Sequence, residues 1–570
     1  SKSVINTVTQ VTRNSETSAH ATKSFESLSQ IGALSGLNGA FINHPSYGNL
    51  EVISVTPNSL QVLANGKKVS ITDSITLNDI LQNSKIDSPA SATQIQTTKK
   101  LVQSGAIDAV ARSQIEAAPQ RIAEARSELA SALGVKEGNL NLEQVPKQIA
   151  ALPAAQQQNA LLALNTYNEE SNRPQYAQSE IFQSKTMESR AWMAQFNQIG
   201  NIQAAQQQAN EAAYADAQMM QSRKEYNTQR MKSNELYILS ANLALPYQDP
   251  KQKAINEILI AQNEEQNAKL RLESLKFEQL LSPTKDPIGV SKQQASYASE
   301  SVRTAETILK LTQKQLKSIS ELISQSDLTK KEDLIAQQKQ LEIKENALEV
   351  GMEYMAEKTS QFETIASADK AHQTLIAEYT LRIHELSFVA DSLGSELEGI
   401  SQAVETSVNP REEDIEKVQL LAVSQRAVRY SIDNLISNAA EATVQSIPDA
   451  INTLITEPGI SSIDKIQAIS SIEVQNLPEV LRATTVAAKL EAISRLGSAE
   501  TLSNPLPPYI ISQIDQDQSL TLAQKENAKA IARSAQNTLI SQARQYYMET
   551  RGNFEAAKNE QLQNTQQESE

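Results

Sequence analysis

The stretch IAEYTLRIHELSFVADSLGSELEGISQAV, residues 376–404, carries the strongest periodic pattern in the chain. Apolar side chains recur there at alternating intervals of three and four residues, at Ile376, Tyr379, Ile383, Leu386, Ala390, Leu393, Leu397, Ile400 and Val404. This spacing places them on one face of an α-helix, as at the a and d positions of a coiled coil. We expect these residues to form a seam through which the chain oligomerises.

Weaker seams precede this stretch. One begins at Val302, and another recurs at sevens from Leu334 to Phe362 with polar residues such as Gln338 and Glu345 at its d positions. Seams of unequal quality predict a bundle of unequal helices rather than one uniform coiled coil.

The composition favours long helices. Only 4% of the 570 residues are aromatic, only 16 are Gly, and the mean hydropathy is −0.42. Ala, Gln, Ser, Leu, Glu and Lys dominate, and most of these residue types are strong helix formers. The sequence therefore predicts a mainly α protein, an elongated multi-helix or coiled-coil bundle.

One short region is expected to be β structure. Asn65-Gly66 separates two strand-like runs between Leu60 and Ile71, and this dipeptide suits a two-residue type I′ hairpin. Residues 51–55 could add a third strand. The sequence thus predicts one non-helical element, a small N-terminal β-hairpin.

Pro and Gly positions divide the chain, because Pro removes a helical N–H and clashes with the preceding turn. We expect breaks inside 74–174 at Gly105, Pro119 and Gly134, and a break near Ser326 and Gly351 further along. The expected segments are an N-terminal arm (1–48), a small β element (49–73), a short-helix subdomain (74–174), an Ala/Gln-rich long helix (175–245), a Pro-containing connector (246–289), long coiled-coil helices (290–408), a helix with a short-helix subdomain (409–508), and a C-terminal helix with a polar tail (509–570).

No recognisable catalytic centre is present in the sequence. The chain has no Cys, which excludes disulfides, thiolate metal sites and Cys nucleophiles. His384-Glu385 lacks the second His of a zincin motif. Glu188-Ser189 matches the start of the lytic transglycosylase signature, but the Gly-Leu-Met-Gln element of that family does not follow it. We expect no enzymatic activity, no cofactor and no metal.

Residues 28–42, LSQIGALSGLNGAFI, are the most apolar run. They are shorter than a membrane-spanning helix requires, although Gly32 and Gly36 form a small-xxx-small pair that suits helix contact in lipid. A packed arm and a membrane-contacting segment both remain open readings.

The chain is acidic, with a formal net charge of −15, yet its C-terminal part carries a basic stripe. Helical arithmetic places five basic residues near one face, namely Lys525, Lys529, Arg533, Arg544 and Arg551. The net charge argues against a general nucleic-acid coat. The stripe is suited to contact with a polyanion or an acidic partner, or it is simply a solvated helix face.

The run AAQQQANEAAYADAQMMQSRKEY, residues 204–226, lies within an Ala/Gln-rich region flanked by long helices. In texture it resembles the internal virion, or ejection, proteins of short-tailed bacteriophages. This resemblance implies a protein synthesised in the host cytoplasm, stored inside the capsid, and passed into the host envelope to assist genome delivery. Its implied partners are copies of itself, other virion proteins such as the portal, and the DNA that passes through.

Two other classes fit the same features. A secreted helical translocator or needle-tip-like protein is also typically free of Cys and rich in coiled coil, and a cytoplasmic coiled-coil scaffold fits the composition equally well. Liposome leakage that depends on residues 28–42 would favour the translocator. Portal and tail genes beside the gene for this chain would favour the virion protein.

Overall fold

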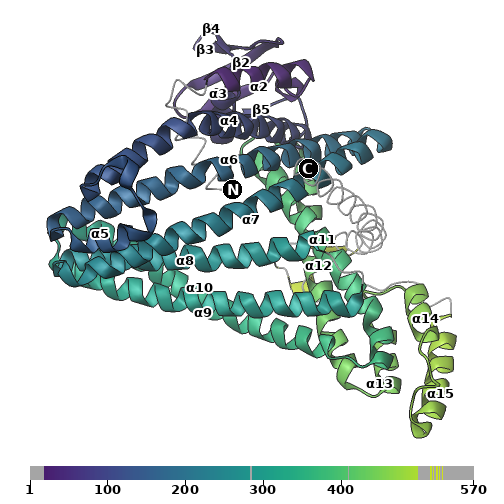
Figure 1. Cartoon of the computed structure of the whole chain (residues 1–570). Coiled ribbons are helices and arrows are strands. Elements are labelled where there is room, and N and C mark those ends of the chain that lie inside the picture. The colour runs from purple at the N-terminus through teal and green to yellow at the C-terminus, as the bar shows by residue number, and fades with distance from the viewer. Residues whose placement is uncertain are drawn as a thin grey trace, which may run out of the picture.

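The computed structural model describes residues 18–282, 286–407 and 410–497, together with 514–516, 518, 521–523, 525, 526 and 529. These residues form a mainly α multi-helix bundle with a small antiparallel sheet near the N-terminus, as the sequence predicts (Figure 1).

The sheet has five antiparallel strands in the order β4-β3-β2-β1-β5. Their bounds are Phe41–His44 (β1), Gly48–Val55 (β2), Leu60–Ala64 (β3), Lys67–Ile71 (β4) and Lys85–Asp87 (β5). The expected hairpin is β3–β4, and both turn residues have positive φ, 51° at Asn65 and 77° at Gly66. The third strand is confirmed as β2, whereas β1 and β5 carry no clear strand pattern in the sequence.

Two helices cover the sheet and complete an α/β head, which we define as residues 18–87. They are α2 (Ser18–Gln30) and α3 (Ser74–Asn83). The core of the head is mainly apolar, with Phe25, Leu34, Leu37, Leu60 and Leu77 all at 0% exposure. The described part of the expected N-terminal arm, from residue 18 onward, is therefore an integral part of this head.

The expected short-helix subdomain consists largely of long helices. Helix α4 (Ala92–Leu133) begins with a capping box at Ser91 and ends at Gly134, whose φ is 69°. It continues through Gly105 and Pro119, where we expected stops. After the short α5 (Val145–Ala151), α6 (Ala154–Gln198) likewise passes through Pro174, so the boundary expected there lies inside a helix.

The middle of the chain forms helical hairpins. Helices α7 (Ile202–Ala244) and α8 (Pro250–Leu281) follow, so the expected single helix over 175–245 is divided at Gly200, and the expected connector is mostly helix. Helices α9 (Pro287–Gln325) and α10 (Leu328–Ala366) meet at the predicted break near Ser326. Gly351 lies inside α10, so the break expected there is wrong.

The last third of the chain begins with a helical pair, α11 (Lys370–Glu405) and α12 (Glu412–Val444). Three short helices follow, α13 (Ile447–Ile455), α14 (Ser462–Ser470) and α15 (Glu479–Leu496). Ser446 and Ser461 cap the first two by accepting hydrogen bonds from backbone N–H groups. This agrees with the short helices predicted after residue 447.

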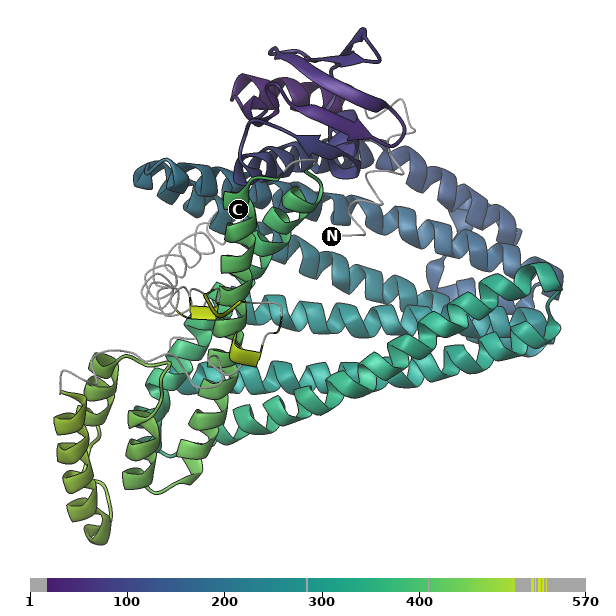
Figure 2. The same cartoon turned by 180° about the vertical axis from the view of Figure 1, so that it is seen from behind.

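The helices build an open frame rather than a compact globule. The long helices α4 to α10 spread from a corner near α5, and the α11–α12 pair stands across their far ends (Figures 1 and 2). The turn between α11 and α12 reaches the head, where the Ile86 N–H donates to the Thr406 carbonyl over 2.6 Å. The Ala92 N–H donates to Asp414 Oδ2 over 3.0 Å. Residues more than 300 positions apart therefore close the frame.

Candidate functional site

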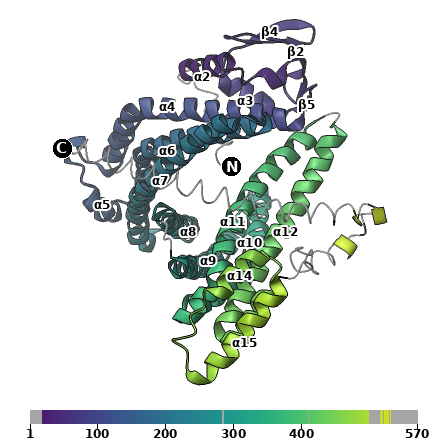
Figure 3. The ribbon, with the colours of Figure 1, turned by 90° about the vertical axis from the view of Figure 1, so that its right-hand side faces the viewer.

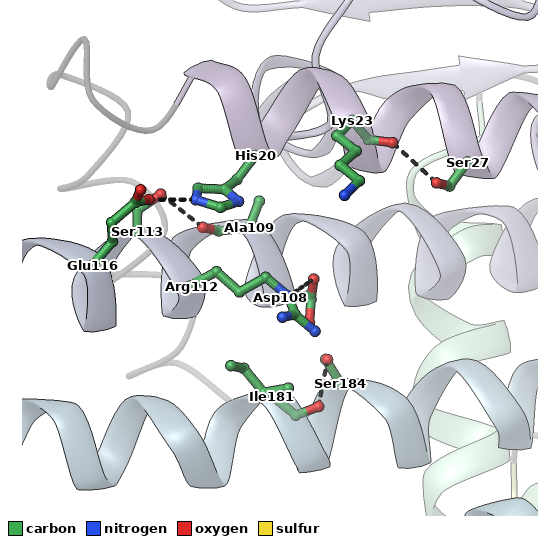
Figure 4. Close-up of polar contacts among 10 residues, drawn as sticks. All are labelled: His20, Lys23, Ser27, Asp108, Ala109, Arg112, Ser113, Glu116, Ile181 and Ser184. Carbon is green, nitrogen blue, oxygen red and sulfur yellow. Dashed lines mark hydrogen bonds and ion pairs between the residues drawn. The ribbon is translucent and has the colours of Figure 1, made fainter.

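A cleft of about 920 Å³ lies between helices α2, α4, α6 and α7. Its walls carry the charged side chains Lys23, Arg112, Lys185, Glu188 and Glu211, with hydroxyl, amide and apolar groups between them. Figure 4 shows the part of this cleft where α2, α4 and α6 face one another.

Close packing of α2 on α4 forms one end of the cleft. A Cβ added at Gly105 would lie 2.5 Å from Ser24 Oγ and 2.9 Å from Leu28 Cδ1, so a larger residue here would force these two side chains to move. Gly105 is thus a packing residue in the middle of α4 rather than a helix stop.

Most charges in the cleft are paired. Arg112 Nε donates to Asp108 Oδ2 over 2.9 Å on α4, and Lys185 Nζ lies 3.6 Å from Glu211 Oε2 across α6 and α7. Figure 4 shows the Arg112–Asp108 pair lying between α4 and α6. These pairs are partly solvated and contribute little to stability, but they fix the polar lining of the cleft.

Glu188 is a third carboxylate of the lining, beside Asp108 and Glu211. Burial raises the pKa of its carboxyl, and Asp108 and Glu211 add to this effect while the Lys185 ammonium opposes it. A buried carboxyl with a raised pKa, placed in a cleft, marks a candidate contact for a bound polar molecule. The Glu188-Ser189 dipeptide gave no reason to select Glu188 from the sequence. The pKa of its carboxyl is raised by burial among four helices that are distant in the sequence.

The seam predicted on α11 is buried inside one chain. Six of its residues are at most 9% exposed, and Ala390, Leu397 and Val404 are partly buried against the same core. The core also contains side chains of α12, α13 and α14, such as Leu435, Leu454 and Ile469. The expectation of a seam between copies is therefore corrected, because the chain's own helices cover it.

About half of the apolar run 28–42 lies in the core of the head, whereas Ile31 and Phe41 are 52% and 56% exposed. Leu34 and Leu37 are 0% exposed in the head, and a Cβ at Gly36 would lie 2.7 Å from Thr98 Oγ1 on α4. The small residues thus allow close packing within the protein, and the membrane-contacting reading gains no support from their position. No helix among the described residues is long and apolar enough to cross a membrane.

The basic stripe lies at the edge of the described chain. Lys525 Nζ donates to the Asp515 carbonyl over 2.8 Å, and Lys529 Nζ lies 2.7 Å from Asp515 Oδ1. These contacts raise the pKa of Lys529, chiefly through its hydrogen bond to Asp515. Arg533, Arg544 and Arg551 lie outside the described residues.

An apolar tip on the α6–α7 hairpin was not anticipated. Ile199 and Ile202 are 66% and 77% exposed beside the tight turn at Gly200, and Trp192 stacks on Phe196 just below them with ring centroids 6.0 Å apart. The turn projects beyond α11 in Figures 1 and 2. Exposed apolar side chains gathered on a projecting element are typical of a contact surface.

No protein-family model, curated protein or solved structure matches this chain. Within the described residues, no group of three or more His, Asp or Glu side chains is arranged to hold a metal ion.

Proposed function

We propose that this chain is a structural component of a bacteriophage particle, an internal protein that assembles with itself and with other virion proteins and assists genome delivery. The observation that carries the proposal is the α6–α7 hairpin, which extends from an open frame and exposes Ile199 and Ile202 at its tip. Burial of two such side chains against a neighbouring subunit would stabilise the contact by about 1.5–3 kcal/mol each.

The length of the helices supports a role in building a large structure. Helix α6 has 45 residues and so extends about 67 Å. Long helices in an open frame span a large distance while burying little apolar surface. They also present separate contact surfaces to several neighbouring subunits. A compact enzyme of this length would bury a larger apolar core.

The interior between α7 and α8 supports a rearrangement between storage and delivery. Asn234 Nδ2 donates to Asn267 Oδ1 over 2.9 Å, and both side chains are at most 3% exposed. Nearby, Asn227 Nδ2 donates to Ser274 Oγ over 3.1 Å. Polar contacts add little net stability, since water satisfies the same groups on opening. Such an interface separates at lower cost than an apolar one.

The acidic balance of the chain fits a channel wall. A formal charge of −15 repels DNA phosphates, so a wall formed by this protein would let DNA slide without binding it. The texture of the Ala/Gln-rich segment, which resembles phage ejection proteins, agrees with this assignment.

The test is to locate the chain in purified phage particles. Protease treatment followed by mass spectrometry should find the wild-type chain protected inside the capsid. Particles that carry Ile199→Asp with Ile202→Asp should contain at least about tenfold less of it, since a loss of ~1.4 kcal/mol is tenfold in affinity. Leu162→Asp is the matched control, because Leu162 is 63% exposed on α6 but is not at the tip. Absence of the wild-type chain from particles would overturn the proposal.

A further inference from the structure

Helix α15 carries apolar side chains on two opposite faces. The face that packs on α13 and α14 buries Thr485, Ala492 and Leu496. The opposite face presents five exposed side chains, namely Val480, Ala483, Ala487, Leu490 and Ser494. Of these, Val480 is 85% exposed and Leu490 is 66% exposed. A surface helix normally turns its polar side to solvent, so an apolar outer face indicates a contact surface.

The five exposed positions follow a 3-4-3-4 spacing, which is the spacing of the a and d positions of a coiled coil. We call these five residues the α15 seam. Its apolar members stand outside the core that contains Ala492 and Leu496. Figures 1 and 3 agree that α15 lies at the outer edge of the molecule, beside α14. The seam is therefore accessible to another molecule.

The basic residues nearest the core are held by the chain itself. Arg482 Nε donates to the Leu477 carbonyl over 2.8 Å, and Lys489 Nζ donates to the Ile472 carbonyl over 2.9 Å. Both side chains are thus directed toward the body of their own chain. The seam itself contains no charged residue, so it is suited to an apolar partner rather than a charged one.

The seam is complementary to a second copy of itself that runs in the opposite direction. In an antiparallel pair of helices, a positions of one helix pack against d positions of the other. When Val480 is aligned with Leu490 of a second copy, Ala483 is aligned with Ala487 of that copy. Large side chains then meet large ones at both ends, and Ala meets Ala between them. The two helices can therefore pack closely along the whole seam.

The residues that flank the seam agree with this alignment. It brings the two copies of Val486 together on one side of the seam and the two copies of Thr484 together on the other. Glu479 and Glu491 lie on opposite sides, so no like charges meet. A parallel pair would instead place Val486 beside Glu491 of the other copy, and it would also align the two helix dipoles in the same direction. The antiparallel arrangement is favoured.

We propose that α15 of this chain pairs antiparallel with α15 of a second copy through the α15 seam. The contact is small, since it uses far fewer residues than the roughly 20–30 on each side of a stable dimer. It is therefore weak between free chains and forms where another contact already holds the copies close together. The inference rests on the proposed self-assembly through the α6–α7 hairpin, which supplies that other contact.

Cross-linking of full-length chains tests the alignment directly, because the chain has no Cys of its own. Chains that carry Ala483→Cys, mixed with chains that carry Ala487→Cys, should form disulfides between chains under mild oxidation. The matched control mixes Ala356→Cys with Ala487→Cys, since Ala356 is also an exposed Ala but lies on α10. The first mixture should give at least about tenfold more linked dimer, as expected of a held rather than a diffusing pair.

Substitution of the seam supplies a second arm of the test. Val480→Asp with Leu490→Asp, added to both chains of the first mixture, should abolish the excess of linked dimer. Leu328→Asp should leave the excess unchanged, because it alters a side chain that is 84% exposed but lies on α10. Equal cross-linking in the two mixtures would overturn the proposal. So would links mainly between two copies of position 483, which belong to a parallel pair.

The outcome is separable from that of the proposed function. Chains that assemble in light scattering but give no 483–487 link would remove this inference and leave the assembly through the hairpin standing. A 483–487 link, together with Ile199→Asp and Ile202→Asp chains that assemble as well as the wild type, would support the α15 pair and count against the hairpin.

Discussion

At the scale of single residues, the sequence predicted which side chains are buried better than it predicted their partners. Ile376 and Tyr379 are fully buried on α11, as their spacing indicated. The same spacing cannot tell a partner helix in the same chain from one in another copy, because both satisfy an apolar stripe equally well. Glu188 shows the other limit, since no motif around it reports burial between distant helices.

Gly399 offers a test of the close contact between α11 and α4. A Cβ added there would lie 1.7 Å from Gln96 Nε2, and Gln96 is itself 8% exposed. We predict that Gly399→Ala lowers the free energy of unfolding by about 1–3 kcal/mol, as overpacking does. Urea denaturation measures this. Gln96→Ala should restore most of the loss in the double variant, and a failure to do so would mean that the backbone at Gly399 is strained instead.

The buried lysines predict how stability depends on pH. Burial lowers the pKa of Lys465 to about 8, and it does the same for Lys99. The unfolded chain, in which a Lys pKa is near 10.5, then binds more protons than the folded chain between about pH 8 and 10.5. The loss of stability caused by these buried ammonium groups is therefore complete below about pH 8. It decreases as the pH rises from about 8 to 10.5.

Lys465→Met should remove the penalty at its position. Allowing for the lost hydrogen bond from Lys465 Nζ to the Ile455 carbonyl, we predict about 1–3 kcal/mol of added stability at pH 7. The gain should shrink toward pH 10.5. Thermal melts at pH 7 and pH 10 check this, and a gain that is equal at both values would contradict the assignment.

At the scale of elements, turn and cap chemistry was predictable, whereas the continuity of the long helices was not. Asn65-Gly66 formed its hairpin and Gly134 ended α4, because both require a positive φ that few residues adopt. Pro119 and Pro174 did not end their helices. The cost of a Pro inside a helix, about 3 kcal/mol, is offset here by packing along helices of more than 40 residues, a tertiary effect that local pattern does not contain.

The polar pair between α7 and α8 gives an element-scale prediction. Asn234→Ala leaves the buried Asn267 amide with fewer partners, so we expect a loss of about 1–3 kcal/mol. Asn234→Leu with Asn267→Leu replaces both groups and should be neutral or stabilising. Calorimetry of the two variants compares them. A double variant less stable than Asn234→Ala would contradict this, and would show that Asn234 and Asn267 stabilise the interface through contacts with other residues.

At the scale of the whole molecule, the closure of the frame was invisible in the sequence. Its contacts join residues near 86–99 to residues near 399–417, and several use backbone atoms, as between Ile86 and Thr406. Backbone groups are the same in every residue, so no sequence pattern marks such a contact. Helix content and bundle class were predictable, but the open frame was not.

Hydrogen exchange can follow this closure. Asp414→Ala removes the acceptor of the Ala92 N–H, so we predict at least about tenfold faster exchange of the Ile86 amide, which crosses the closure. The Val52 amide, bonded to the Ala40 carbonyl within the head, is the internal control and should be unchanged. Equal acceleration at both amides would indicate general unfolding instead of local opening.

The central claim is that the chain acts in an assembly through the tip of its α6–α7 hairpin. Light scattering across a range of concentrations, with and without the other proteins of the particle, tests it most directly. The wild-type chain should reach masses above 62.4 kDa, while Ile199→Asp with Ile202→Asp should remain at 62.4 kDa with unchanged helix content. A wild-type chain that stays at 62.4 kDa under every condition would contradict the account.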